Sequence, residues 1–251
     1  MKLTVLGSGV CAVSKERSCA SYYIEADGLN ILMDIGFGAL RRMAEADIDY
    51  GDVDWVVCTH LHLDHVADLA PLLMALRYTP GLERRKPLTI AGPSQLQDYL
   101  YGCRELLGDW LLQEDKFPIV IRSLNAEPES IGNGKILALP MRHSLPALGC
   151  RLEFDGGVIA YSGDTGWCDE LIELCRGADL AILECSNEDG APFDYHLTPS
   201  QAGLAARLAG VERLMLTHFY PPLDLRRRES AAATVFGKPA IMAEDLMSLT
   251  V

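Results

Sequence analysis

Short strand-like runs alternate with helical segments along the whole chain, and this alternation restricts the fold more than any other feature of the sequence. Tyr22–Ala26 and Asn30–Asp34 are two such runs, joined by a turn at Asp27-Gly28 that is typical of a β-hairpin. Further strands are expected at Lys2–Leu6, Trp55–Cys58, Leu88–Ala91, Ile119–Ser123, Lys135–Pro140, Gly149–Phe154, Val158–Tyr161, Asp179–Leu183 and Arg213–Leu216.

Helices are expected between these strands, at Ala39–Ala46, Val66–Tyr78, Ser94–Gln113, Asp169–Cys175 and Pro199–Ala209, before a final helix and strand. Val66–Tyr78 is predicted as one helix although Pro71 lies near its first turns. Strand-rich pieces in each half, interleaved with helices, predict an α/β fold: an αββα sandwich of two mixed β-sheets with helices on the outer faces. The 251 residues suit one domain, 1–251, whose least regular loops are at Asn125–Gly134 and Glu188–Asp194.

The composition excludes several function classes. A formal charge of −13 argues against stable binding of duplex nucleic acid, which needs a basic surface. No signal peptide is visible after Met1, and no apolar run approaches the ~20 residues of a membrane span. The eight cysteines contain no C-x-x-C pair and are expected to be reduced, so a cytoplasmic location is predicted.

The segment Thr59–His65 (THLHLDH) holds four potential metal ligands where an apolar strand ends. Strand geometry places His60 and His62 on the same side, and a following turn lets Asp64 and His65 fold back toward them. Imidazole and carboxylate at this density suit zinc, manganese or iron. The alternative, a polar loop with chance histidines, fits poorly because three of the six histidines lie here.

Three further candidates also follow predicted strands. His143 follows Lys135–Pro140, Asp164 lies in the Gly-Asp-Thr that follows Val158–Tyr161, and His218 ends the chain's last Thr-His. Ligands at strand ends can converge on one edge of a sheet pair. Each alone could be a turn residue or a satisfied histidine, but together with the Thr59–His65 segment they complete two coordination shells.

These ordered motifs resemble the ligand motifs of the metallo-β-lactamase superfamily. The resemblance implies two divalent metal ions, zinc first and manganese or iron as alternatives. It implies a first metal on His60, His62 and His143, a second on Asp64, His65 and His218, and Asp164 between them.

Other segments are similar to the ribonuclease Z branch and its shorter phosphodiesterase relatives, among them Leu6–Gly9, Arg17-Ser18 and Ile31–Gly36. That branch has a glutamate and a histidine in two further loops, matched here by Glu184 and His196. The resemblance implies that His196, oriented by Glu184, protonates the leaving oxygen. Asp64 would also orient the nucleophile, a metal-bridging hydroxide.

The chain departs from ribonuclease Z in one respect that bears on substrate. Only 20 residues separate His143 from Asp164, which leaves no room for the basic arm that ribonuclease Z uses to hold tRNA. The predicted function is therefore a metal-dependent hydrolase, a phosphodiesterase for a cyclic nucleotide or a short oligonucleotide. The alternatives are a ribonuclease Z-type tRNA endonuclease and a lactonase or thioesterase on the same metals.

Three weaker expectations concern rival functions, the arginine run and the oligomeric state. A redox enzyme and a non-catalytic scaffold are disfavoured, because all seven ligands are present without a flavin domain. Arg226–Arg228 could contact phosphate, but a basic helix surface is the favoured interpretation. Similar proteins are often homodimers, so a homodimer is expected.

Overall fold

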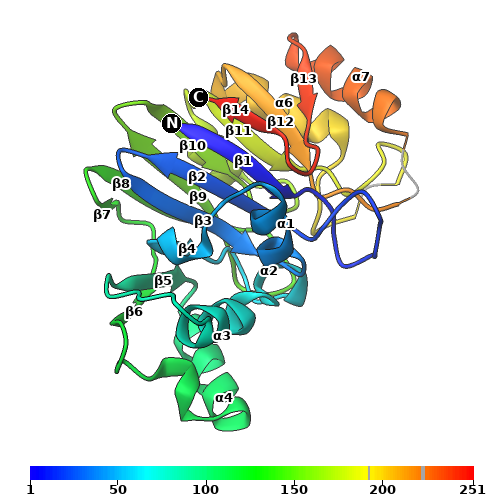
Figure 1. Ribbon diagram of the computed structural model, residues 1–251. Coiled ribbons are helices and arrows are strands. Elements are labelled where there is room, and N and C mark those ends of the chain that lie inside the picture. The colour runs from blue at the N-terminus through cyan, green and yellow to red at the C-terminus, as the bar shows by residue number, and fades with distance from the viewer. Residues whose placement is uncertain (192, 222–223) are drawn as a thin grey trace.

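Two β-sheets face each other in this computed structural model, which describes residues 1–191, 193–221 and 224–251 (Figure 1). In spatial order, the first sheet contains β14 (Ser248–Thr250), β1 (Lys2–Gly7), β2 (Ser21–Ala26), β3 (Leu29–Ile35), β4 (Trp55–Val57), β5 (Leu88–Gly92) and β6 (Ile119–Ser123). The second contains β13 (Ala240–Met242), β12 (Arg213–Thr217), β11 (Leu180–Glu184), β10 (Gly157–Tyr161), β9 (Ala147–Phe154), β8 (Gly134–Met141) and β7 (Glu129–Ile131).

The two sheets share one pairing pattern. Strands β14, β1, β2 and β3 pair antiparallel, and β3 to β6 pair parallel. Strands β7 to β10 likewise pair antiparallel, and β10 to β13 pair parallel. Both sheets are therefore mixed, as predicted. Strands β8, β10, β11 and β12 run in the same direction, so their carboxyl ends share one edge of the second sheet.

Helices cover the outer faces of both sheets, which confirms the predicted αββα sandwich. The first sheet is covered by α1 (Ala39–Glu45), α2 (Leu63–Val66), α3 (Leu69–Tyr78) and α4 (Leu96–Leu107), with the 3₁₀ turns η1 (Tyr50–Asp52) and η2 (Asp109–Leu112). The second sheet is covered by α5 (Asp169–Cys175), α6 (Pro199–Ala209) and α7 (Leu225–Phe236).

The core between the sheets comes from their inward-facing apolar side chains. Tyr22 on β2 and Tyr161 on β10 are buried there, with ring centroids 4.8 Å apart. The hairpin between β2 and β3 forms as predicted, since Asp27 and Gly28 both have the positive φ that such a turn requires, 47° and 80°. The hairpin fixes which β3 side chains face the core.

The expected single helix Val66–Tyr78 is wrong, because α2 and α3 are separate. Pro71 has no N–H to donate to the carbonyl of Ala67, so the helical hydrogen bonding is interrupted there. The second helix, α3, begins only at Leu69. Asp68 immediately precedes α3, but its side chain does not cap this helix. Its carboxylate accepts hydrogen bonds from the backbone of Gly38 (3.1 Å) and Leu40 (3.0 Å). The short helix α2 packs against β3.

Three other boundaries differ from expectation. Ser94–Gln113 is not one helix: Gly108, at φ 106°, separates α4 from η2. Part of the expected loop Asn125–Gly134 forms β7, and the chain ends in two short strands rather than one. In the described part of the chain, no helix is long and apolar enough to cross a membrane.

Candidate metal centre

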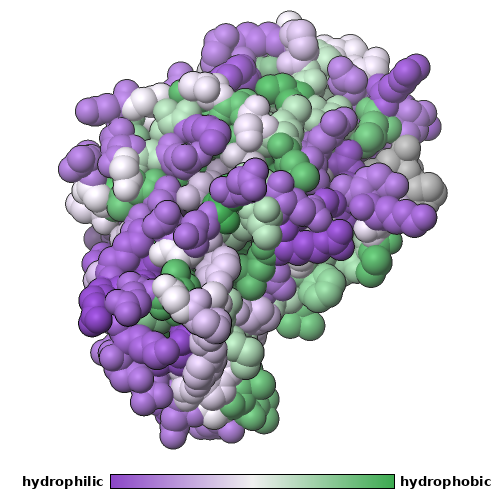
Figure 2. Space-filling view, viewed as in Figure 1, coloured by the Kyte–Doolittle hydropathy of each residue, from purple (hydrophilic) through white to green (hydrophobic). Residues whose placement is uncertain are grey.

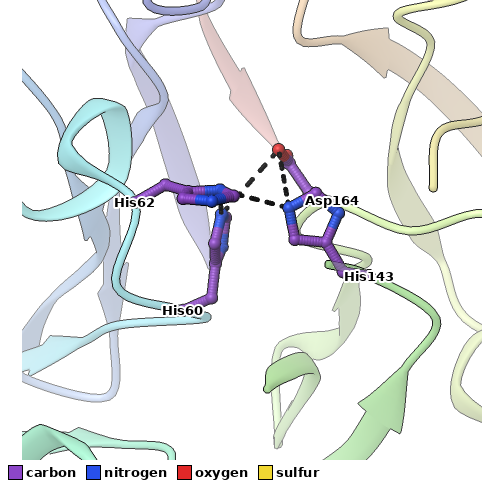
Figure 3. Close-up of side chains that lie close together, drawn as sticks. All are labelled: His60, His62, His143 and Asp164. Atoms are coloured by element: carbon purple, nitrogen blue, oxygen red, sulfur yellow. Dashed lines mark hydrogen bonds and ion pairs between the residues drawn. The ribbon is translucent and has the colours of Figure 1, made fainter. Parts of the chain in front are cut away.

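His60 and His62 follow β4 and face two residues from the second sheet, His143 after β8 and Asp164 after β10 (Figure 3). These four residues are called the first group. His62 Nδ1 lies 3.0 Å from His60 Nε2 and 3.1 Å from His143 Nε2. Asp164 Oδ2 lies 3.8 Å and 4.0 Å from the same two Nε2 atoms. One ligand atom from each residue therefore faces a common point.

The second group consists of Asp64, His65 and His218. Asp64 and His65 lie on α2, and His218 follows β12. His65 Nε2 is 3.2 Å from His218 Nε2, and Asp64 Oδ2 is 3.7 Å from His218 Nε2. Asp164 Oδ1 is 3.3 Å from the Nε2 atoms of both His65 and His218. Asp164 thus presents one oxygen to each group.

Hydrogen bonds fix which nitrogen of each second-group histidine faces the centre. His65 Nδ1 donates to Asp34 Oδ2 at 2.7 Å. His218 Nδ1 lies 2.8 Å from Ser186 Oγ, and the Ser186 hydroxyl donates to the His218 carbonyl, so Oγ accepts from the imidazole. Both Nε2 atoms therefore carry a free lone pair.

The same holds in the first group. The Thr59 hydroxyl donates to Asp34 and so accepts from His60 Nδ1 at 3.1 Å. His143 Nδ1 donates to the carbonyl of Tyr195 at 3.2 Å. The Nε2 lone pairs of both histidines point toward His62 Nδ1, a crowding of acceptors that a cation would relieve.

Asp34, which is fully buried on β3, contacts residues beside or within both groups. Its carboxylate accepts from Thr59 N (2.7 Å), Thr59 Oγ1 (2.9 Å), His65 Nδ1 (2.7 Å) and Tyr161 OH (2.8 Å). Asp34 and His218 both have positive φ, 57° and 61°, a conformation that Asp and His adopt more readily than most residues. The backbone is thus bent at two of the residues that shape the site.

His196 lies beside both groups and is held by Glu184, the last residue of β11. His196 Nδ1 donates to Glu184 Oε1 at 2.6 Å. The buried Glu184 also accepts from the backbone of Thr165 (3.1 Å) and Ser186 (3.0 Å). Burial lowers the pKa of His196, but the hydrogen bond and charge of Glu184 outweigh burial and raise it. The ring stacks on His218, with centroids 5.9 Å apart.

The segment after His196 forms a capping box. Thr198 Oγ1 accepts from the backbone of Gln201, and the Gln201 side chain accepts from the backbone of Thr198, with Pro199 at the start of α6. This cap fixes where the helix begins, and hence where His196 enters the site.

A model of the beta-lactamase superfamily domain matches residues 29–219. The chain belongs to this superfamily. Ribonuclease Z from Ignicoccus hospitalis is 28% identical over 302 residues, covering 100% of this chain and 98% of the relative. The metallo-beta-lactamase fold protein YhfI from Bacillus subtilis has a TM-score of 0.86 at 22% identity, covering 99% of this chain and 98% of its own. The short form of human tRNase Z has a TM-score of 0.81 at 25% identity, covering 100% and 99%. The chain is a hydrolase of the metallo-β-lactamase superfamily.

The superfamily fold implies divalent metal ions, and the residues present fit them. Asp164 Oδ1 is buried and has no hydrogen-bond partner among the described residues. Two ligand atoms about 2.0–2.1 Å from a tetrahedral zinc lie roughly 3.3 Å apart, close to the spacings within both groups. An ion in each group would give Asp164 Oδ1 a partner and separate the facing lone pairs.

The electrostatics of the cluster also favour cations. Burial lowers the pKa of His60 well below its usual value, which keeps the imidazole neutral as a metal ligand requires. At His65, Asp164 and Asp34 outweigh burial and raise the pKa, so these carboxylates attract positive charge. Burial raises the pKa of Asp164, but His218 and His65 outweigh it and hold that pKa well below its usual range.

All seven residues predicted as ligands, together with His196 and Glu184, therefore lie in one site. The sequence reasoning missed the residues that orient them: Asp34, Thr59, Ser186 and the Tyr195 carbonyl. Asp34 lay in a segment already noted for its resemblance, but nothing in the sequence assigned it to His65. Ser186 is two residues beyond Glu184, a proximity that could have drawn attention to it.

The prediction that Arg226–Arg228 form a basic helix surface is wrong for one residue. Arg226 and Arg227 are exposed, but Arg228 is buried against the segment that follows β11. Its guanidinium donates to the carbonyls of Cys185 and Asn187 (3.0 Å for Asn187). Arg228 faces inward because α7 packs against α6 with this side toward the core.

Proposed function

We propose that this hydrolase is a phosphodiesterase with two zinc ions, acting on a small phosphodiester such as a cyclic nucleotide or a short oligonucleotide. The observation that carries this proposal is the His196–Glu184 pair, placed beside two groups of convergent ligands. A hydrolase that only needed an activated water would not need an oriented imidazole on a separate carboxylate. A leaving alkoxide does need a proton donor.

The first group would hold one ion and the second group the other, with Asp164 shared between them. Divalent ions at such a paired site lower the pKa of water and neutralise charge on phosphoryl oxygens. Asp34, Ser186, Thr59 and the Tyr195 carbonyl would keep the imidazoles of His65, His218, His60 and His143, respectively, in the tautomer that binds metal. Asp64 would also orient the nucleophile, because its Oδ2 lies 3.7 Å from His218 Nε2 within the second group.

His196 would deliver a proton to the leaving oxygen. Glu184 accepts from Nδ1, so Nε2 is the nitrogen left to face the substrate. The charge of Glu184 favours the protonated imidazole, which is the form that a general acid requires. Two backbone N–H groups hold the carboxylate in place, so Glu184 acts as a positioning residue.

The size of the substrate follows from the connection between the two groups. Strands β9 and β10 are joined through Asp155-Gly156, so the chain between His143 and Asp164 is a plain hairpin. The ribonuclease Z relative matches over 302 residues against 251 here, and it therefore contains additional segments. Without an inserted arm, and with a net charge of −13, a small substrate fits better than tRNA. A ribonuclease Z-type tRNA endonuclease remains the second candidate, because two of the similar proteins are named ribonuclease Z and tRNase Z.

The test compares two leaving groups in the metal-loaded enzyme. His196→Ala should lower kcat on the order of 10²–10⁴-fold for a ribose or alkyl leaving oxygen, and far less for p-nitrophenolate, which needs no proton. Glu184→Gln should show the same dependence with a smaller loss. Hydrolysis of lactones or thioesters by the wild type, with none of bis(p-nitrophenyl) phosphate or cyclic nucleotides, would contradict the proposal.

A further inference from the structure

Three large apolar side chains with unusually high exposure line one cavity of about 740 Å³. Val13 is 94% exposed, Leu63 70% and Phe37 68%. Side chains this exposed add little to the core, and apolar surface gathered in one place usually marks a binding site. The volume lies within the range of about 300–1,000 Å³ that is typical of small-ligand sites.

The cavity borders the proposed metal centre at one residue. Asp64, a member of the second group, is part of its lining, and Leu63 precedes Asp64 on α2. The loop after β1 forms another wall, and the backbone N–H of Cys11 in that loop donates to Asp64 Oδ2 at 3.0 Å. A ligand in the cavity would therefore lie next to a phosphate bound at the centre.

The loop after β1 is held in place before any ligand binds. Asp245 accepts hydrogen bonds from the backbone of Ser8 (2.9 Å) and Ser18 (2.6 Å), at the two ends of this loop. The guanidinium of Arg17 donates to Ser8 Oγ and to the Ala243 carbonyl, and it lies 4.9 Å from the centroid of the Phe219 ring. The cavity wall is thus pre-organised, which reduces the entropy lost on binding.

The charges around the cavity suit an anion with an apolar substituent. Four cations, Lys15, Arg17, Arg41 and Arg42, contribute to the lining together with Asp64 and Asp68, in a chain whose net charge is −13. Arg42 forms ion pairs with Glu45 and Asp245, and Arg41 also forms an ion pair with Glu45. Lys15 lies in the lining and is in no ion pair with another described residue, so its ammonium can meet a phosphate there.

We propose that this cavity binds the nucleobase of the substrate, with the Phe37 ring as its stacking surface and Leu63 and Val13 against its edges. The proposal rests on the proposed phosphodiesterase function and narrows its substrates to nucleotides. An exposed aromatic ring stacks on any base through its π-face, at about 1–3 kcal/mol per base. Stacking of this kind gives affinity without strong sequence preference.

The position of His196 identifies which nucleoside enters the cavity. His196 belongs to the connection between β11 and α6 of the second sheet, whereas the cavity is built from the first sheet's loops and helices. The leaving oxygen belongs beside His196, so in a linear diester the cavity holds the nucleoside that the product phosphate retains. In a cyclic nucleotide it holds the single base.

The experiment uses two diesters with the same leaving group and different retained substituents. Metal-loaded enzyme is assayed with the p-nitrophenyl ester of thymidine 5′-monophosphate and with methyl p-nitrophenyl phosphate. The wild type should prefer the nucleoside ester. Phe37→Ala should remove most of this preference, a loss of about 5- to 150-fold in kcat/KM, mainly through KM. Its activity on the methyl ester and its metal content should not change.

Matched variants distinguish stacking from general damage. Phe37→Trp should keep the preference, because it keeps an aromatic face. Leu106→Ala removes a side chain that is 87% exposed on α4 and lies outside the cavity lining. It should not change kcat/KM for either ester. Figure 2 shows hydrophobic surface at this lower end of the molecule.

Three results would overturn the assignment. Equal rates for the two esters in the wild type, or an equal effect of Phe37→Ala on both, would show that no base occupies the cavity. Loss of vesicle binding or of self-association in Phe37→Ala, with both activities intact, would assign the surface to a membrane or a second copy. Failure of the wild type to cleave either ester would instead refute the proposed function itself.

Discussion

Asp34→Asn is the sharpest test of how the centre is built, because the change removes one charge and leaves the shape of the side chain unchanged. In the wild type, Oδ2 accepts three hydrogen bonds, from Thr59 Oγ1, His65 Nδ1 and Tyr161 OH, and Oδ1 accepts one from Thr59 N. The asparagine oxygen would take the position with three donors. Its NH₂ would then face the Thr59 N–H, donor against donor.

Two effects of different size follow. The buried Thr59 N–H loses its acceptor, which costs about 1–3 kcal/mol of folding free energy. For a domain of this size, that loss corresponds to a fall in Tm of roughly 2–12 °C. The neutral amide also holds His65 less firmly and makes its Nε2 a weaker ligand. Loss of such a supporting contact typically lowers metal affinity about 10–100-fold.

The assay measures both quantities in the same preparation. Zinc affinity is determined by competition with a chelator, and unfolding is followed by circular dichroism in chelator-treated protein. Asp245→Asn is the matched control, because the Asp245 side chain is only 3% exposed and accepts from Ser8, Ser18 and Arg42 but touches no proposed ligand. It should lower Tm and leave zinc affinity unchanged. If Asp34→Asn also left zinc affinity unchanged, Asp34 would support the fold alone and the assigned tautomer of His65 would lose its basis.

Three further outcomes are expected. Purified protein should carry about two transition-metal ions per chain, and Asp164→Ala should weaken both sites together in metal analysis; one tight ion and an unaffected variant would contradict the dinuclear assignment. Pre-tRNA should be cut no better than a short RNA with the same scissile bond, whereas a large preference that disappears without the tRNA elbow would favour the endonuclease alternative. Arg228→Lys should lose about 1.5–3 kcal/mol of stability for each charge-assisted hydrogen bond removed, measured by chemical unfolding, while the exposed Arg227→Lys should not.

The ligand set could be predicted from sequence because each ligand follows a strand-like run. Strand ends that meet at one sheet edge bring distant residues together, so His143, Asp164 and His218 could be placed beside the Thr59–His65 segment. The hairpin at Asp27-Gly28 was predictable for a similar reason: its backbone conformation is set by two adjacent residues. Features that depend on local sequence, or on where a strand ends, are visible without a structure.

The residues that orient the ligands depend on tertiary packing and leave no such trace. Asp34 reaches His65 because β3 and β4 are adjacent parallel strands, a pairing that the sequence does not state. Arg228 lies in a run of three arginines, and only the packing of α7 decides which one is buried. The helix break before Pro71 was open to prediction, but it required weighing the missing N–H against the continuous apolar pattern of the segment.

The charge of the chain and the charge of its proposed substrate are compatible only if the centre is metal-loaded. Four carboxylates surround the site: Asp34, Asp64, Asp164 and Glu184. Within the described residues they contact imidazoles, hydroxyls and backbone amides rather than lysine or arginine. An anion approaching this cluster alone would be repelled. Two divalent ions would add four positive charges and reverse the local field, while Lys15 would attract phosphate from the cavity side. The net charge of −13 therefore excludes a broad grip on nucleic acid but permits a small phosphodiester, since only the centre and the cavity rim need to be positive.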